Sequence, residues 1–181
     1  MSVVVIPHDP RWARIFEEEA PAVAAGLGPQ LVQIHHVGST SIPGIYAKPV
    51  VDMLAEVRSI EDVDPRNEAM ASLGYEAKGE YGIEGRRYFR KSTPEGVRAF
   101  HLHVFQESSP HSQRMLAFRD YLRAHSDAAS SYSDLKRRLV SRPIDSDAYV
   151  SGKDALVKAL EQDALTWAKR CSPTGASPGP S

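Results

Sequence analysis

The chain has 181 residues, of which 41% are hydrophobic and 25% are charged, so its length and composition suit one globular domain with a sizeable core. Its 22 Lys and Arg residues nearly balance 23 Asp and Glu residues, and the net charge of −1 excludes the positive field typical of non-specific nucleic-acid binding. The single cysteine, Cys171, excludes a disulfide framework, and no apolar run approaches the roughly 20 residues of a membrane helix. We therefore expect a cytoplasmic protein without membrane or nucleic-acid partners.

The first half of the chain alternates helical and extended patterns. Asp9 and Pro10 form a typical helix start, and an apolar stripe continues from there toward Leu27. A second helical pattern begins at Asp62 and ends near Gly74. The predicted strands are residues 31–37, 50–57 and 75–78, and residues 38–48 are predicted to form a loop.

The second half begins with a predicted hairpin and then becomes helical. Residues 86–91 and 97–105 have strand composition and flank a turn, and His101 and His103 share one face because side chains alternate along a strand. From residue 110 onward the apolar spacing is helical. We expect one domain over residues 1–171, followed by a disordered Pro-, Gly- and Ser-rich tail over residues 172–181.

The predicted loop between the first two strands suits a phosphorylated ligand. Gly38 lets the backbone approach a ligand closely, hydroxyl and backbone N–H groups can donate to phosphate oxygens, and Asp52 can hold a divalent ion. The phosphate-binding candidates in this segment are Gly38, Ser39, Thr40, Ser41 and Lys48. The alternative is that the segment contains only ordinary turns and that Asp52 is a satisfied polar residue at a strand start.

A second source of positive charge is the predicted strand at residues 86–91. Alternation places Arg86 and Arg90 on one face and Arg87 and Lys91 on the other, so only one pair can face a given cleft. We take Arg87 and Arg90, one from each face, as further phosphate-binding candidates.

Several motifs in this chain together resemble the GrpB family. They are PHDPRWARIFEEEA, HHVGSTSIPGIYAKPVVDML, GRRYFRK, HLHVF, FRDYLRAH, YSDLKRRL and DAYVSGKDALV, in that order over about residues 3 to 170. The resemblance implies the nucleotidyltransferase fold: an α+β domain with a small mixed β-sheet packed by helices and a C-terminal helical segment. It also implies a Gly-Ser turn that grips a nucleoside triphosphate, and carboxylates on the following strands that bind Mg²⁺.

The carboxylates do not all carry over. Asp52 matches the first acid, but Leu54 stands where that superfamily usually has a second. Glu56 lies roughly 13 Å along the strand from Asp52, too far to share one ion. The segment expected to supply a third acid carries His101 and His103 instead.

These departures from the superfamily pattern leave Asp52, His101 and His103 as the catalytic candidates. If the two histidines share the face of Asp52, the three side chains suit a transition metal such as Zn²⁺ or Mn²⁺, or a base beside a phosphate; otherwise the histidines are a solvated pair. His36, two residues before Gly38, is a further metal-ligand candidate.

The helical half offers fewer candidates. Lys136, Arg137 and Arg138 are predicted to be a solvated helix face, and so are Arg119 and Asp120. The resemblance leaves open a role in shaping the cleft for Arg119, Tyr132, Lys136 and Lys153.

Two functions follow from this reading. The first is an enzyme that binds a nucleoside triphosphate and transfers a nucleotidyl group to a small-molecule acceptor, or activates that acceptor. The second is a nucleotide- or metal-binding module that kept the fold and lost the catalytic carboxylates. Leu54 favours the module, whereas the Ser, Lys, Arg and His residues around the loop favour the enzyme.

Overall fold

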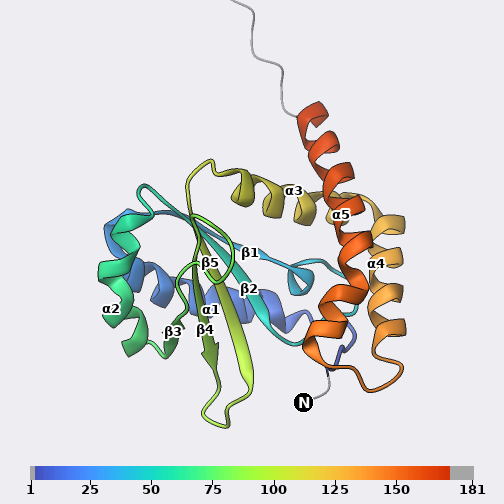
Figure 1. Ribbon diagram of the computed structural model, residues 1–181, viewed down its shortest axis with the longest axis horizontal. Helices are drawn as coiled ribbons and strands as arrows, with labels where there is room; N and C mark the ends of the chain where they lie inside the picture. Colours follow the sequence, from blue (N-terminus) through green and yellow to red (C-terminus); the bar gives the residue numbers. More distant parts are fainter. Residues whose placement is uncertain (1–2, 172–181) are drawn as a thin grey trace, which may run out of the picture.

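The protein folds around one five-stranded mixed β-sheet (Figure 1). The computed structural model describes residues 3–171, so the predicted disordered tail lies outside the described residues. The strands are β1 (Leu31–Val37), β2 (Val51–Val57), β3 (Tyr75–Ala77), β4 (Arg87–Ser92) and β5 (Arg98–Gln106). The sheet order is β1-β2-β5-β4-β3, with β2 and β5 parallel and the other neighbours antiparallel. The predicted α+β class, strands and hairpin are confirmed.

Within residues 3–171, five helices pack around this sheet. They are α1 (Arg11–Leu27), α2 (Asn67–Ser72), α3 (Pro110–Ala124), α4 (Ser126–Leu139) and the long α5 (Ser146–Cys171). Short 3₁₀ turns occupy η1 (Gly28–Gln30), η2 (Ser39–Ser41) and η3 (Glu61–Arg66). Figure 1 shows α4 and α5 side by side at one end of the sheet, with α2 at the opposite end.

The first face of the sheet carries the main core. Met53, Ala55 and Val57 of β2 point to this face and pack against the apolar side chains of α1 and α2. Met70 of α2 and Leu27 of α1 belong to the same buried cluster. Apolar side chains of α1 and α2 therefore cover this face of the sheet.

The second face is only partly covered. Leu54 of β2 and Phe105 of β5 pack near Met115 of α3 at one end of the strands. Toward the start of β2 no such apolar cover follows, and polar side chains occupy the face instead, beginning with Asp52. The site described below lies at this end.

The loop after β1 is fixed to the helical layer. Ile42 and Ile45 belong to a buried cluster with Leu122 of α3, Tyr132 of α4 and Leu160 of α5. This packing holds the loop of residues 38–48, called the Gly-Ser loop below, between the sheet and the helices.

An extended N-terminal stretch connects the two layers as well. The Val3 N–H donates to the Ile144 carbonyl over 2.9 Å, just before α5, and Ile6 forms an isolated antiparallel bridge with Ala47 of the loop.

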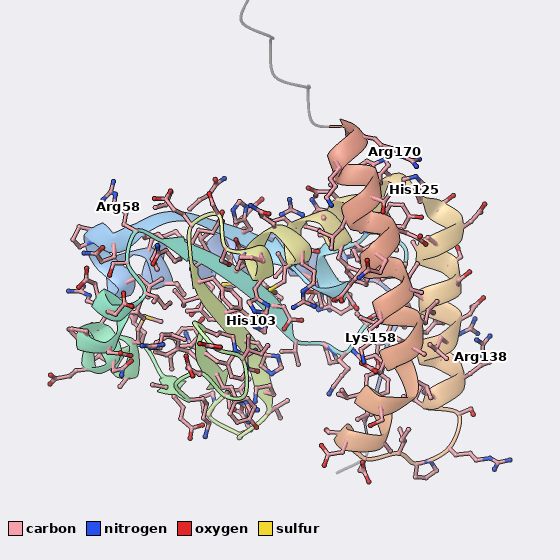
Figure 2. The ribbon with its side chains drawn as sticks, turned by 45° about the horizontal axis from the view of Figure 1, so that its top comes forward. Arg58, His103, His125, Arg138, Lys158 and Arg170 are labelled. Carbon is pink, nitrogen blue, oxygen red and sulfur yellow. The ribbon has the colours of Figure 1, made fainter. Side chains whose placement is uncertain are left out.

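The predicted solvated face of α4 is partly wrong. Arg137 and Arg138 are exposed, and Figure 2 shows Arg138 on the outer side of α4. Lys136 is only 1% exposed, because its position four residues after buried Tyr132 places it on the inward stripe of the helix.

Candidate functional site

The centre of the site is a row of side chains across three neighbouring strands. Asp52 of β2 is the register partner of His101 of β5, which in turn pairs with Arg90 of β4. His101 Nδ1 lies 3.0 Å from Asp52 Oδ1, and His103 Nε2 lies 3.8 Å from the same oxygen. Both histidines therefore share the face of Asp52. Of the two alternatives that the sequence left open, the structure shows this one and not the solvated pair.

Asp52 is held in its ionised form. Burial raises the pKa of this carboxyl group, but hydrogen bonds from His101 and His103 outweigh that effect and keep the pKa well below its usual range. The site therefore presents a carboxylate with two imidazoles bound to it at neutral pH.

Gly38 is required by the position of Asp52. Its φ of 69° lies in the left-handed region that favours glycine. A Cβ atom there would also collide with the Asp52 carboxylate. The Ser41 hydroxyl donates to the Gly38 carbonyl over 2.7 Å, which closes the turn.

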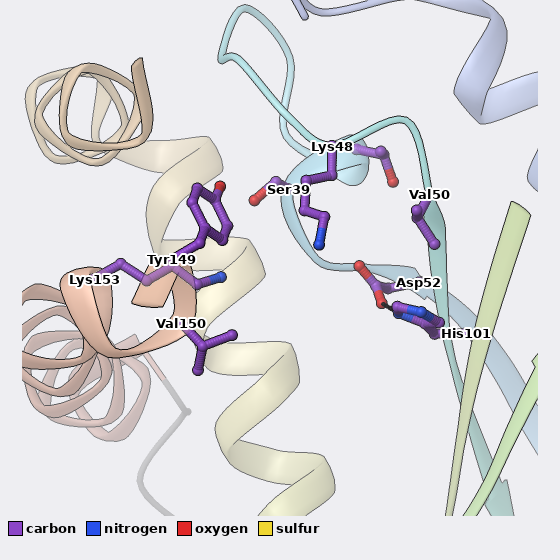
Figure 3. Close-up of a pocket in the computed structure, with 9 residues that line it drawn as sticks. Ser39, Lys48, Val50, Asp52, His101, Tyr149, Val150 and Lys153 are labelled. Atoms are coloured by element: carbon purple, nitrogen blue, oxygen red, sulfur yellow. Dashed lines mark hydrogen bonds and ion pairs between the residues drawn. The ribbon is translucent and has the colours of Figure 1, made fainter. Parts of the chain in front are cut away.

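A cavity of about 200 Å³ opens between this loop and α5. Figure 3 shows Lys48 and Lys153 extending into it from opposite walls, with Asp52 and His101 at one side. The lining residues are Ser39, Thr40, Lys48, Val50, Asp52, His101, Tyr149, Val150 and Lys153. The structure thus brings together Ser39, Thr40, Lys48, Asp52 and His101 of the predicted set.

The cavity is positively charged opposite Asp52. The Nζ atoms of Lys48 and Lys153 lie 5.6 and 5.1 Å from the centroid of the Tyr149 ring. Burial lowers the pKa of Lys48, and the positive charge of Lys153 lowers it further. Within residues 3–171 neither lysine forms an ion pair.

A third lysine stands in the helical layer next to this wall. Lys136 Nζ lies 4.2 Å from the Tyr132 ring centroid and has no hydrogen-bond partner. Burial lowers the pKa of Lys136 to about 7, with a smaller effect from Lys153.

Sequence reasoning missed Tyr149 as a site residue. Its ring is 2% exposed and is contacted by both cavity lysines. The available signal was its place in the motif DAYVSGKDALV, four residues before Lys153, because residues four apart lie on one side of a helix.

The two arginines predicted to bind phosphate do not line the cavity. Arg87 is on the opposite face of β4, where its Nε and Nη2 atoms donate to the Asp64 carboxylate over 2.6 and 2.8 Å. Its assignment to the phosphate site is therefore wrong, because the alternation of the strand turns it toward η3. Arg90 does share the face of Asp52 but does not line the cavity.

His36 also points away from the Asp52 carboxylate. It pairs in register with Met53, on the α1 side of the sheet, and stacks on Phe16 with 5.1 Å between ring centroids. Its Nε2 lies 2.9 Å from Thr40 Oγ1, and burial lowers its pKa to about 4. His36 supports the loop from the α1 side of the sheet and does not complete a metal site with Asp52.

The loop is braced from α3 as well. Arg119 Nη1 donates to the His36 carbonyl over 3.2 Å, and Arg123 Nε donates to the Ser41 carbonyl over 2.9 Å. The prediction of a solvated Arg119 is wrong, because this side chain is turned inward to carbonyls at the end of β1.

The carboxylates do not fit the two-Mg²⁺ arrangement that the resemblance implies. Leu54 is fully buried, and Glu56 is bound to His35 over 3.2 Å. Within residues 3–171, no group of three or more His, Cys, Asp and Glu side chains is arranged to hold a metal ion. Asp52 alone remains as an anchor for an ion that a ligand also binds.

The arrangement of sheet and helices defines the class of this protein. Its structure aligns with that of Cid1 in complex with the short product ApU at a TM-score of 0.51, covering 73% of this chain and 42% of Cid1. At 9% sequence identity the likeness concerns the fold alone. The chain is therefore an α+β protein with a nucleotidyltransferase-like fold.

The chain belongs to the GrpB family. The family profile described as "GrpB protein" matches residues 2–163. The crystal structure of the conserved protein GrpB from Enterococcus faecalis superposes with a TM-score of 0.86 at 39% identity, covering 92% of this chain and 99% of that one. The predicted family is confirmed.

Two curated relatives are longer than this chain. The UPF0157 protein YqkA of Bacillus subtilis is 45% identical over 168 residues, which cover 92% of this chain and 48% of YqkA. A dephospho-CoA kinase of Mycolicibacterium paratuberculosis is 27% identical over 190 residues, covering 92% of this chain and 47% of that protein. The chain thus spans about half the length of these two relatives.

The helices of residues 3–171 differ from membrane-spanning helices. None of them combines the length and the apolar character that crossing a bilayer requires.

Proposed function

We propose that this protein binds the phosphate chain of a nucleoside triphosphate in the cavity between the sheet and α5, and transfers a nucleotidyl group to a small-molecule acceptor. The charge layout of the cavity carries the proposal. The ionised Asp52, bound by two imidazoles, lies at one side, and Lys48 and Lys153 project from the walls without acidic partners in the described chain.

The two lysines favour a polyanion. Burial is the larger cause of the lowered pKa of Lys48, and repulsion from the like charge of Lys153 in the same cavity is the second. A phosphate chain between Lys48 and Lys153 would remove the conflict. A cavity of about 200 Å³ suits phosphates, and the nucleoside would extend toward solvent.

The Asp52–His101 pair supplies a proton acceptor. The Nδ1 atom of His101 faces the carboxylate, so the tautomer with a proton on Nδ1 donates to Asp52 and leaves Nε2 to accept a proton from an incoming hydroxyl or amine. In the proposed reaction the acceptor oxygen or nitrogen bonds to the α-phosphorus while the bond to the bridging oxygen breaks. Pyrophosphate leaves toward the lysines, which stabilise its charge.

A divalent ion would bind at this site only together with the nucleotide. Among the described residues, Asp52 is the one carboxylate that lines the cavity, so it would hold a single Mg²⁺ together with phosphate oxygens. Such an ion would neutralise part of the phosphate charge.

The second candidate function is a binding module without turnover. The observation that favours it is Leu54, which is fully buried where the superfamily pattern has a second acid. Both functions require the same nucleotide site, so they differ only in whether chemistry follows binding.

Calorimetry tests the shared step. We would titrate the protein with each of the four ribonucleoside triphosphates, with and without Mg²⁺, Mn²⁺ or Zn²⁺. Dephospho-CoA and CoA belong in the panel because relatives of about twice the length of the matched segment are dephospho-CoA kinases. If no triphosphate binds under any of these conditions, the proposal is wrong.

Pyrophosphate release separates the two functions. An enzyme releases pyrophosphate from a bound triphosphate in the presence of an acceptor, whereas a module binds the nucleotide and leaves it intact. The Asp52→Asn variant is the control, because it keeps the size of the side chain and removes its charge.

A further inference from the structure

A further cation without an acidic partner within residues 3–171, Arg90, lies on the other side of the Asp52–His101 pair. Arg90, His101 and Asp52 occupy one row across β4, β5 and β2 and share a face. Neighbouring strands are about 4.8 Å apart, so the Cα atom of Arg90 is roughly 10 Å from that of Asp52. Lys48 and Lys153 approach Asp52 from the loop and α5, so the pair lies between two separate positive regions.

Arg90 has no acidic partner in the described chain. Its Nε atom is buried without a hydrogen bond. Its guanidinium carbon lies 4.5 Å from the Tyr81 ring centroid and 5.3 Å from that of Tyr88. Glu76, its register partner on β3, is instead paired with Lys78. The positive charge of Arg90 is therefore framed by two aromatic rings and left unneutralised.

The surrounding contacts hold this frame in place. Arg86 is 6% exposed and uses its Nη2 and Nε atoms to donate to the carbonyls of Tyr81 and Glu80 over 2.7 and 3.1 Å. Tyr81 thereby keeps a φ of 46°, which a tyrosine rarely adopts, while its ring stays 54% exposed and stacked on Tyr88. Arg86 thus supports the frame around Arg90, whose Nε atom has no hydrogen-bond partner.

We propose that Arg90, with the rings of Tyr81 and Tyr88, binds an oxyanion of the acceptor, either a carboxylate or a phosphate. This inference rests on the proposed nucleotidyl transfer and names the acceptor class: a small molecule with a hydroxyl or amine near an oxyanion. A planar guanidinium binds two oxygens of such a group at once. Because His101 lies between Arg90 and Asp52, the acceptor's hydroxyl would rest beside the imidazole that takes its proton.

The test compares three hydroxyl compounds that differ in charge. Glycolate carries a carboxylate, glycerol 3-phosphate carries a phosphate, and glycerol is neutral. Each would be titrated by calorimetry into the nucleotide-loaded protein and into the Arg90→Gln and Tyr81→Ala variants. The matched control is Arg87→Gln, which changes the other arginine of β4, on the opposite face of the strand and bound to Asp64. The nucleotide dissociation constant would be measured for every variant.

We expect at least one anionic compound to bind the parent, and Arg90→Gln to weaken it about tenfold or more, as the loss of a charge-assisted hydrogen bond does. Tyr81→Ala should weaken it less, and Arg87→Gln should not change it. Nucleotide affinity should stay unchanged in all three variants. The carboxylate and phosphate arms identify the preferred oxyanion.

Two outcomes separate this inference from the proposed function. If the parent binds triphosphate but binds neither anion more tightly than Arg90→Gln does, the acceptor site is wrong and the nucleotide site stands. If the parent binds no triphosphate, the proposed function itself fails.

Discussion

The Nδ1 atom of His101 and the Oδ1 atom of Asp52 are 3.0 Å apart, although 49 positions separate the two residues in the chain. The parallel pairing of β2 with β5 makes them direct register partners. A carboxylate that orients an imidazole in this way fixes which ring nitrogen is free to accept a proton.

The first prediction concerns that carboxylate. Asp52→Asn should lower pyrophosphate release by about 100-fold or more, because the amide no longer orients a basic His101. The fold should persist, since the two side chains have nearly the same size. Pyrophosphate release and the thermal midpoint would be measured on one preparation. A variant with parental turnover would remove Asp52 from the mechanism.

The second prediction concerns Gly38. Gly38→Ala should lower the free energy of unfolding by about 2 to 4 kcal/mol, since the new methyl group meets the Asp52 carboxylate in a left-handed backbone. Urea denaturation measures the change. The control is Gly44→Ala, where φ is also positive at 80° but the added Cβ atom would have no atom within 4 Å apart from those of its chain neighbours. Gly44→Ala should cost only about 1 kcal/mol, and equal losses at both positions would show that the contact with Asp52 is unimportant.

The third prediction concerns the buried Lys136. Its pKa is lowered to about 7 from a model-peptide value of 10.5. Between those pH values the unfolded chain holds a proton that the folded chain lacks, so the free energy of unfolding should rise with pH from 7 to 10.5. Below pH 7 the full cost of burying the ammonium group remains.

Lys136→Met should therefore stabilise the protein at pH 7 by on the order of a few kcal/mol and flatten the pH dependence above pH 7. Denaturation curves at pH 6, 7, 8 and 9 measure both effects. The control is Lys158→Met on the exposed side of α5, where the lysine pairs with Asp154. A Lys136→Met protein that is less stable than the parent would contradict the assigned burial cost.

The fourth prediction concerns the two cavity lysines. Lys48→Ala and Lys153→Ala should each weaken triphosphate binding about tenfold or more, and each should reduce its salt dependence. Lys158→Ala, on the same helix as Lys153 but outside the cavity, should leave the affinity unchanged. Calorimetry at two salt concentrations measures both quantities. Equal affinities for the Lys153 and Lys158 variants would place the phosphates elsewhere.

Strand alternation made much of the sheet side of the site predictable. It paired His101 with His103 and Arg86 with Arg90, and the structure places all four side chains on the face of Asp52. The same rule places Arg87 and Arg90 on opposite faces of the sheet. Only one of these two phosphate-binding candidates could therefore lie near Asp52.

The helical side of the site was less accessible to sequence reasoning. Tyr149 and Lys153 reach the cavity only because α5 packs at the end of the sheet, and no local pattern fixes that placement. Lys136 was misassigned because three successive basic residues resemble a solvated surface. Its spacing from Tyr132 carried the correct signal, since residues four apart share a helix face.

The N-terminal stretch has a mechanical consequence for the cavity. Through Val3 it is tied to Ile144, five residues before Tyr149, and through Ile6 it is tied to Ala47, the neighbour of Lys48. The stretch therefore connects the loop that carries Lys48 to the start of α5, which carries Lys153. Its length limits how far these two lysines can separate. Inserting a single residue between Val3 and Ile6 would change the distance between the two cavity walls that a phosphate chain must bridge. All side chains that line the cavity would still be present.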